Sequence, residues 1–260
     1  MSGMATLASV SSDFSDAIDF IFHKRESVSG GIQVGGPHEL LTLAATHMRI
    51  SLIAVALACA VSIPLGLYLG HIGRGEFLAI SVSNIGRAVP SLALLAFFVA
   101  YIGLGDLNII TVLFLLAVPP ILTNTYVATR QVDRNTVDAA RGLGMSERQI
   151  VRKVELPLGL ATIFGGIRTS TVNVVATATI APLANVKTLG YPIINTNVYG
   201  FSGTLGAAIV VALLTLFLDG LLAYVQRVVT PKGIKIRAAG GAAPRRGKFF
   251  AMRTPREGQA

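Results

Sequence analysis

Five long stretches of the chain are apolar and almost free of charge. A transmembrane helix needs about 20 mostly apolar residues to cross a hydrocarbon core roughly 30 Å thick. Each stretch is long enough, and apart from Arg49 at the outer edge of the first, the charges inside them are Arg87, Arg168 and Asp219. The pattern predicts an all-α integral membrane protein with five spans, at residues 47–70, 77–102, 108–129, 158–184 and 205–226.

The composition supports this interpretation. Of the 260 residues, 52% are hydrophobic and only 13% are charged, whereas about 25% of an average soluble domain is charged. A mean hydropathy of +0.65 leaves too few polar groups to cover a water-exposed surface. A soluble protein is therefore excluded.

The net charge of +9 lies mostly at one end of the chain. From Thr230 onward there are eight Lys/Arg and one acidic residue, so the remainder carries only +2. This distribution does not indicate a nucleic-acid-binding surface, and it fits a basic tail held at a lipid surface. We expect the tail, residues 230–260, to be disordered.

Basic residues also predict the orientation. Six Lys/Arg lie between the third and fourth spans, whereas the loops near 103–107 and 185–204 hold only Lys187. Lys/Arg-rich loops stay in the cytoplasm, so the segment after span three and the tail are predicted to be cytoplasmic, with the N-terminus outside. Residues 1–40 then form an extracytoplasmic leader, either disordered or with a short amphipathic helix, and residues 41–229 form the membrane domain.

The segment 133–157 has the pattern of two short helices with a break between them. Asn135 or Thr136 can cap the first helix, glycines can end it, and Ser146 with Gln149 forms a capping box for the second. Pro157 is expected to redirect the chain into span four. Such a hairpin suits docking to a cytosolic partner, although an ordinary solvated loop is the alternative.

The same segment resembles the cytoplasmic signature of ABC-importer permeases, in which an acidic-Ala-Ala triplet precedes a glycine and an aliphatic-x-Leu-Pro ending. The resemblance implies a five-span type I importer permease in which this segment is the coupling helix that inserts into the ATP-hydrolysing subunit. The one departure is Asp for the commoner Glu. The matching residues are Asp138, Ala139, Ala140, Gly144, Val154, Leu156 and Pro157.

Other stretches look like the osmoprotectant branch of that family, which imports glycine betaine, choline, carnitine or proline betaine. After span four, residues 185–190 depart from the glycine-rich stretch common in that branch, so amino-acid import stays an alternative. The resembling stretches are Ser62–Gly66, Ala88–Leu95, Gly166–Thr169 and Ala176–Thr179.

The resemblance also implies the partners: cytosolic ATPases that bind ATP and Mg, a second permease chain, an extracytoplasmic solute-binding protein and the bacterial cell membrane. The chain has no phosphate-binding G-x-x-x-x-G-K-[S/T] loop, no paired-Cys or HExxH metal motif and no catalytic motif. We therefore expect a transport subunit without enzymatic activity or cofactor. An ion-gradient-driven transporter predicts an inverted repeat, which the five spans do not show, and a channel-like or structural protein is a weaker alternative.

Polar residues form two stripes at helical spacing, which either line a translocation path or join helices by hydrogen bonds. Since an unpaired charge inside a membrane is costly, Asp219 is predicted to pair with Arg87 or Arg168, unless each arginine snorkels separately to the surface. Phe97, Phe98 or Tyr101 would have to supply any cation-π contact to a quaternary ammonium. The stripes are Ser81, Asn84, Arg87 and Ser91 in span two, and Thr169, Asn173 and Thr177 in span four.

Overall fold

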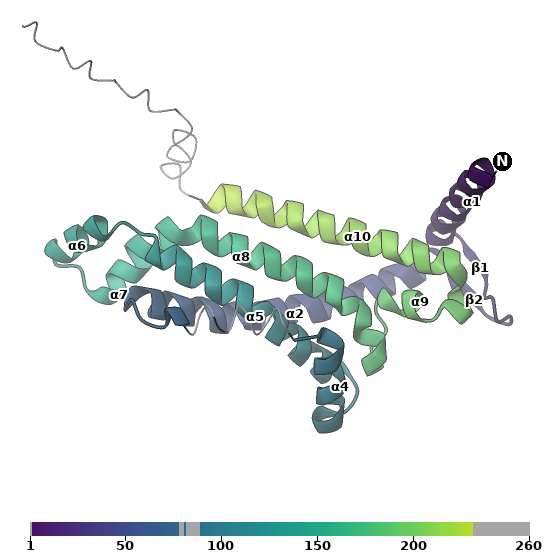
Figure 1. The fold of residues 1–260 in the computed structure, drawn as a ribbon, viewed down its shortest axis with the longest axis horizontal. Coiled ribbons are helices and arrows are strands. Elements are labelled where there is room, and N and C mark those ends of the chain that lie inside the picture. Colours follow the sequence, from purple (N-terminus) through teal and green to yellow (C-terminus); the bar gives the residue numbers. More distant parts are fainter. Residues whose placement is uncertain (1, 78–80, 82–88, 231–260) are drawn as a thin grey trace, which may run out of the picture.

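The computed structural model describes residues 2–77, 81 and 89–230, with side chains from residue 12 onward. Four long helices lie side by side along the molecule (Figure 1): α2 (Gly36–His71), α5 (Asp106–Arg130), α8 (Leu156–Thr177) and α10 (Thr196–Val229). The other elements are α1 (Ser2–Phe22), β1 (Lys24–Glu26), β2 (Gln33–Gly35), α4 (Ser91–Ile102), α6 (Arg134–Gly142), α7 (Glu147–Ile150), the π-helix η1 (Val151–Glu155), the 3₁₀ helix η2 (Ala178–Ala184) and α9 (Gly190–Ile194).

The main core lies between α2, α5 and α8. Ile50 and Ala54 of α2 pack with Ile109 and Leu113 of α5 and with Val174 of α8, all fully buried. α10 covers α8, and α1 packs on the first half of α10. The four long helices thus form a layered bundle, with α4 projecting from its side (Figure 1).

Small residues let α2 and α5 approach closely. A Cβ added to Gly66 would lie 2.7 Å from Thr125 Cβ, and one added to Gly70 would lie 2.6 Å from Thr129 Cβ. Both threonine hydroxyls donate to carbonyls four residues earlier in α5, so no hydroxyl is left unpaired at this contact. Glycine pairs four residues apart are typical of helix packing in membranes.

At the end that holds the N-terminus, the antiparallel hairpin β1–β2 and α1 contact the start of α10. The sequence pattern did not predict this hairpin. In α1, Ala17 and Phe20 are fully buried, whereas Phe14, Ile18 and Phe22 remain exposed on this chain. Phe20 packs edge-to-face on Tyr199 of α10, so Ala17 and Phe20 form the side of α1 that packs on this chain.

Of the five predicted spans, the described residues show three helices that are long and apolar enough to cross a membrane: Gly36–His71, Asp106–Arg130 and Thr196–Val229. Residues 158–184 form α8 and η2 instead of one uniform helix. Within 77–102, α4 spans only Ser91–Ile102, and residues 78–80 and 82–88 lie outside the described residues. The predicted disordered tail lies outside them from residue 231 onward.

Candidate functional site

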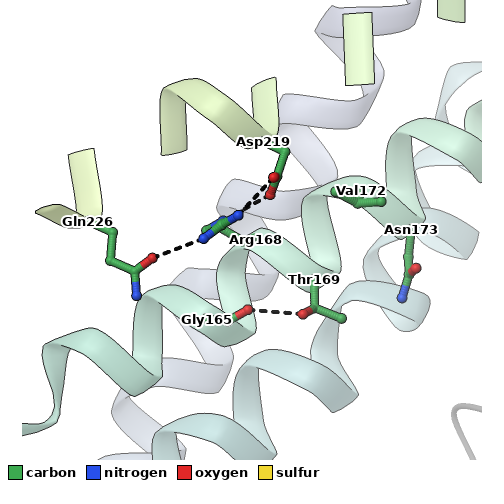
Figure 2. Close-up of a pocket in the computed structure, with 7 residues that line it drawn as sticks. All are labelled: Gly165, Arg168, Thr169, Val172, Asn173, Asp219 and Gln226. Carbon is green, nitrogen blue, oxygen red and sulfur yellow. Dashed lines mark hydrogen bonds and ion pairs between the residues drawn. The ribbon is translucent and has the colours of Figure 1, made fainter. Parts of the chain in front are cut away.

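One face of α8 carries a row of polar side chains that neighbouring helices leave accessible. Arg168, Thr169 and Asn173 line a cavity of about 460 Å³ together with Asp219 and Gln226 of α10 (Figure 2). Thr169 donates its hydroxyl hydrogen to the Gly165 carbonyl. The cavity therefore lies between α8 and α10, and polar groups from both helices face it.

Arg168 and Asp219 form a bidentate ion pair across this cavity. Arg168 Nε is 2.9 Å from Asp219 Oδ1, and Arg168 Nη2 is 2.8 Å from Asp219 Oδ2. Gln226 accepts a further bond from Arg168 Nη1 at 3.3 Å and donates to the Ala161 carbonyl at 2.7 Å. Two parallel bonds fix the guanidinium plane as well as neutralising the charge.

The pairing agrees with one of the two predicted alternatives for Asp219; Arg87, the other, lies outside the described residues. Both charges of this pair lie inside predicted spans, and neither is fully buried within the single chain. The side chains of Arg168 and Asp219 are 32% and 35% exposed, because the outer flank between α8 and α10 is not covered by another helix of the described part. Within this chain the pair is accessible at the cavity.

A second cavity of about 340 Å³ continues along the same face of α8. It is lined by Asn173 and Thr177 of α8, by Ser91 at the start of α4, and by Pro119 and Pro120 of α5 among others. Asn173 lines both cavities. The structure thus brings together Ser91, Thr169, Asn173 and Thr177, but Ser81 does not line either cavity, and Asn84 lies outside the described residues.

The sequence pattern did not predict two of the contributions to these cavities. Gln226 lies near the end of α10 and belonged to neither predicted polar stripe. It is nevertheless seven residues, or two helical turns, beyond Asp219. The Pro119–Pro120 pair was visible in the sequence, but nothing there indicated that it faces Asn173.

At the other end of the molecule, the segment 133–157 forms the predicted helical hairpin. Gly144 has φ +82°, the left-handed conformation that the break requires, and Ser146 with Gln149 forms a complete capping box. The cap of α6 differs from the prediction: the Asp133 side chain accepts from the Asn135 backbone N–H, so the capping residue lies two positions before Asn135. A small local core of Val132, Val137, Ala140 and Ile150 holds the hairpin together.

Pro157 does not redirect the chain, contrary to the sequence prediction. Helical geometry continues from α7 through η1 into α8, and the Leu156 N–H bonds to the Val151 carbonyl five residues earlier. A proline ring clashes with the carbonyl four residues before it and offers no N–H. The wider π-helical turn is typical of such interruptions, so the chain passes Pro157 without a break.

The signature residues differ in their exposure. Asp138, Ala139 and Gly144 are exposed, Ala140 is buried in the local core, and Val154, Leu156 and Pro157 are half-buried. Leu143, in the turn, is 84% exposed. The tip of the hairpin therefore presents an exposed apolar side chain beside the exposed Asp138 of α6.

Charged side chains connect the hairpin to α2. Arg141 donates to both carboxylate oxygens of Glu147 at 2.9 and 3.1 Å and to Asp138 at 2.9 Å. The bonds from Arg141 hold the pKa of Glu147 below its ordinary value. Glu155 is almost fully buried against His71, and this burial raises the pKa of Glu155.

Long apolar helices, a polar face along one of them and a helical hairpin at one end define a membrane transport subunit. A family model described as the binding-protein-dependent transport system inner membrane component matches residues 62–231. The chain belongs to this family of ABC-transporter permeases, as the resemblance of the 133–157 segment predicted.

Relatives with assigned names cover most of the chain. The glycine betaine/carnitine/choline transport system permease protein OpuCB of Bacillus subtilis (strain 168) is 40% identical over 198 residues, which cover 76% of this chain and 91% of that protein. The choline transport system permease protein OpuBB of the same organism matches at the same identity and coverage. The osmoprotectant import permease protein OsmW of Salmonella typhimurium is 34% identical over 209 residues, 75% of this chain and 94% of that one.

Solved structures share the fold. An inward-facing MetNI methionine ABC transporter matches with a TM-score of 0.66 at 18% identity, over 75% of this chain and 98% of that chain. An amino acid ABC transporter crystallised with histidines matches with a TM-score of 0.57 at 17% identity, over 73% and 94% of the two chains. At these identities the likeness establishes the permease fold alone.

Proposed function

We propose that this chain is the membrane-spanning subunit of an ATP-driven importer for small osmoprotectants such as glycine betaine, choline or carnitine. The observation that carries the proposal is the 40% identity, over nine-tenths of their length, to permeases named for these solutes. The structural neighbours named for amino acids are less than 25% identical, so they support the fold and not the substrate.

In this proposal the accessible face of α8 forms one wall of the translocation path, and a second permease chain forms the other. Arg168 and Asp219 neutralise each other, so the wall offers hydrogen-bonding groups with little net charge. Such a wall suits brief contact with a zwitterion or a compact cation, while tight recognition belongs to a solute-binding protein outside the membrane.

The hairpin 133–157 is the coupling segment and faces the cytoplasm, where it docks on the ATPase that binds ATP and Mg. Its exposed Leu143, Asp138 and Ala139 supply an apolar contact with a charged rim. The N-terminus lies outside, and five spans cross the bacterial cell membrane. ATP-driven closure of two ATPases then moves the two permease chains between inward-open and outward-open states.

Reconstitution tests the proposal. The chain is purified with the ATPase and binding protein that accompany it in its native membrane, and uptake of labelled glycine betaine, choline, carnitine and methionine into liposomes is measured with and without ATP. We expect ATP-dependent uptake of at least one of the first three. Uptake of methionine alone would replace the osmoprotectant assignment, and uptake driven by an ion gradient without an ATPase would overturn the importer class.

A further inference from the structure

His71 is the last residue of α2 and lies between two glutamates of the hairpin segment. Its Nδ1 is 2.8 Å from Glu155 Oε2, and its Nε2 is 3.0 Å from Glu147 Oε2. The side chain of Glu155 is 1% exposed and that of His71 is 14% exposed. One imidazole thus joins α2 to both α7 and η1.

These three groups must share a proton. A neutral imidazole has one N–H donor and one bare nitrogen, whereas an ionised carboxylate only accepts hydrogen bonds. Both contacts are hydrogen bonds only when the cluster holds one additional proton, on the imidazole or on a glutamate. Without that proton, a lone pair of the ring faces a carboxylate and one contact becomes repulsive.

The cluster continues to the exposed face of α6. Glu147 is held by Arg141 through two bonds, and Arg141 is also bonded to Asp138, the acidic residue of the signature triplet. The polar connection therefore runs from Asp138 through Arg141 and Glu147 to His71.

Beside this connection, α2 and the hairpin segment are separated by a cavity of about 830 Å³. Leu67, Tyr68 and Ile72 line it from α2 and the turn after it, and Val151 and Leu156 line it from the opposite side. Arg148 and Arg152 also face the cavity, and Arg130 and Arg134 approach the turn at Gly73. Such open space lets the two parts move relative to each other unless side chains hold them.

We propose that His71 is a positioning residue that locks the end of α2 to the hairpin 133–157, so that movement of the hairpin is passed to α2 through the bonds to Glu147 and Glu155. His71 is hydrogen-bonded to both glutamates when the cluster holds its additional proton, and one of these two bonds is lost when that proton leaves. The proposal rests on the proposed function, because it assumes that the hairpin is moved by an ATPase.

The test compares His71→Leu, His71→Gln and Glu155→Gln with a matched control, His38→Leu. His38 is an exposed histidine at the opposite end of the same helix. Each permease is reconstituted with its ATPase and binding protein, and ATP hydrolysis and uptake of labelled choline and glycine betaine are measured together between pH 6 and pH 8.5.

We expect His71→Leu to lower uptake per ATP hydrolysed about five-fold or more, the lower end of typical coupling between sites, while His38→Leu stays at the wild-type value. His71→Gln, which keeps a donor, should recover part of the loss. In the wild type, uptake per ATP should fall as pH rises, and this dependence should be flattened in His71→Leu and Glu155→Gln.

Equal uptake per ATP and an equal pH profile in His71→Leu and His38→Leu would overturn the proposal. If His71→Leu does not assemble, His71→Gln and Glu155→Gln decide by the same two readouts, since His71→Gln keeps a polar side chain and Glu155→Gln is isosteric. Failure of the proposed function is distinguishable: it would leave even the wild-type chain without a bound ATPase or ATP-dependent uptake.

Discussion

Arg168 of α8 and Asp219 of α10 are 51 positions apart in the sequence and form two parallel hydrogen bonds, at 2.9 and 2.8 Å. The pair joins α8 to α10 and places both charges at the cavity that Asn173 also lines (Figure 2). It therefore serves both packing and the electrostatics of the proposed path.

Reversing one charge of this pair should impair assembly, and reversing both should restore part of it. Asp219→Arg places two guanidinium groups side by side, and an uncompensated arginine costs about 2.5 to 3.5 kcal/mol within a membrane. We expect several-fold less assembled permease for Asp219→Arg and partial recovery for Asp219→Arg with Arg168→Asp, measured by size-exclusion chromatography of membrane extracts.

The pair Arg49–Asp106 provides the matched control. It joins α2 to the start of α5, and its side chains are 56% and 43% exposed. Exposed pairs contribute about 0 to 1 kcal/mol, so Asp106→Arg should change assembly little. A double variant at 168 and 219 that assembles no better than Asp219→Arg would contradict a stabilising role for the pairing.

The sequence predicted the membrane fold because a run of about 20 apolar residues is typical of a membrane-spanning helix. It indicated the hairpin because Gly144, Ser146 and Gln149 determine the turn and the helix cap through interactions between near neighbours in the chain. It predicted that Asp219 needs a partner, but choosing one required knowing that α8 and α10 are neighbours. The bonds of His71 to Glu147 and Glu155 join residues 76 and 84 positions apart, and no local pattern links them. The π-turn before Pro157 was missed because a proline usually signals a break, and no residue pattern in the sequence indicated the wider turn that precedes it.

Gly144→Val should strain the hairpin. Gly144 has φ +82°, and a Cβ there would meet nothing within 4 Å, so the penalty comes from backbone conformation and not from a clash. A side chain in such a region costs about 1 to 3 kcal/mol. We expect reduced co-purification of the ATPase and reduced uptake at wild-type permease levels.

Gly142→Val is the control for this prediction. Gly142 is also surrounded by open space, but it is the last residue of α6 and has no positive φ. The two variants add the same side chain, so a loss restricted to Gly144→Val identifies the left-handed turn as the cause. Equal ATPase binding by both variants would show that the turn geometry does not position the docking surface.

The Arg141–Glu147 pair should make stability depend on pH in the acidic range. Hydrogen bonds from Arg141 lower the pKa of Glu147 in the folded chain, whereas an unfolded glutamate has a pKa of about 4.3. A depressed carboxyl pKa stabilises the folded state fully above the unfolded value, and this contribution is lost as pH falls through the lowered folded value.

The measurement is the Tm of purified permease from pH 3.5 to pH 7, for the wild type and for Glu147→Gln. The wild type should unfold at the higher temperature at pH 6 to 7, and the difference should close below about pH 4.3. Glu26→Gln, at an exposed glutamate of β1 far from the hairpin, serves as the control. A Tm difference that stays constant down to pH 3.5 would show that ionisation of Glu147 contributes nothing.

Asn173→Asp should alter which solute is carried, because Asn173 lines both cavities of the α8 face. Arg168 and Asp219 cancel each other there, so the new carboxylate adds an unbalanced negative charge. It attracts the choline cation and repels the carboxylate of glycine betaine. We expect the ratio of choline to glycine betaine uptake to rise several-fold in competition assays, with Asn173→Leu lowering uptake of both solutes.

Thr215→Val is the control. Thr215 lies on α10 outside both cavities, with its hydroxyl bonded to the Val211 carbonyl, so this variant should leave the ratio unchanged. If Asn173→Asp and Thr215→Val give the same ratio, solute does not pass along this face of α8, and the path must be sought on another face of the bundle.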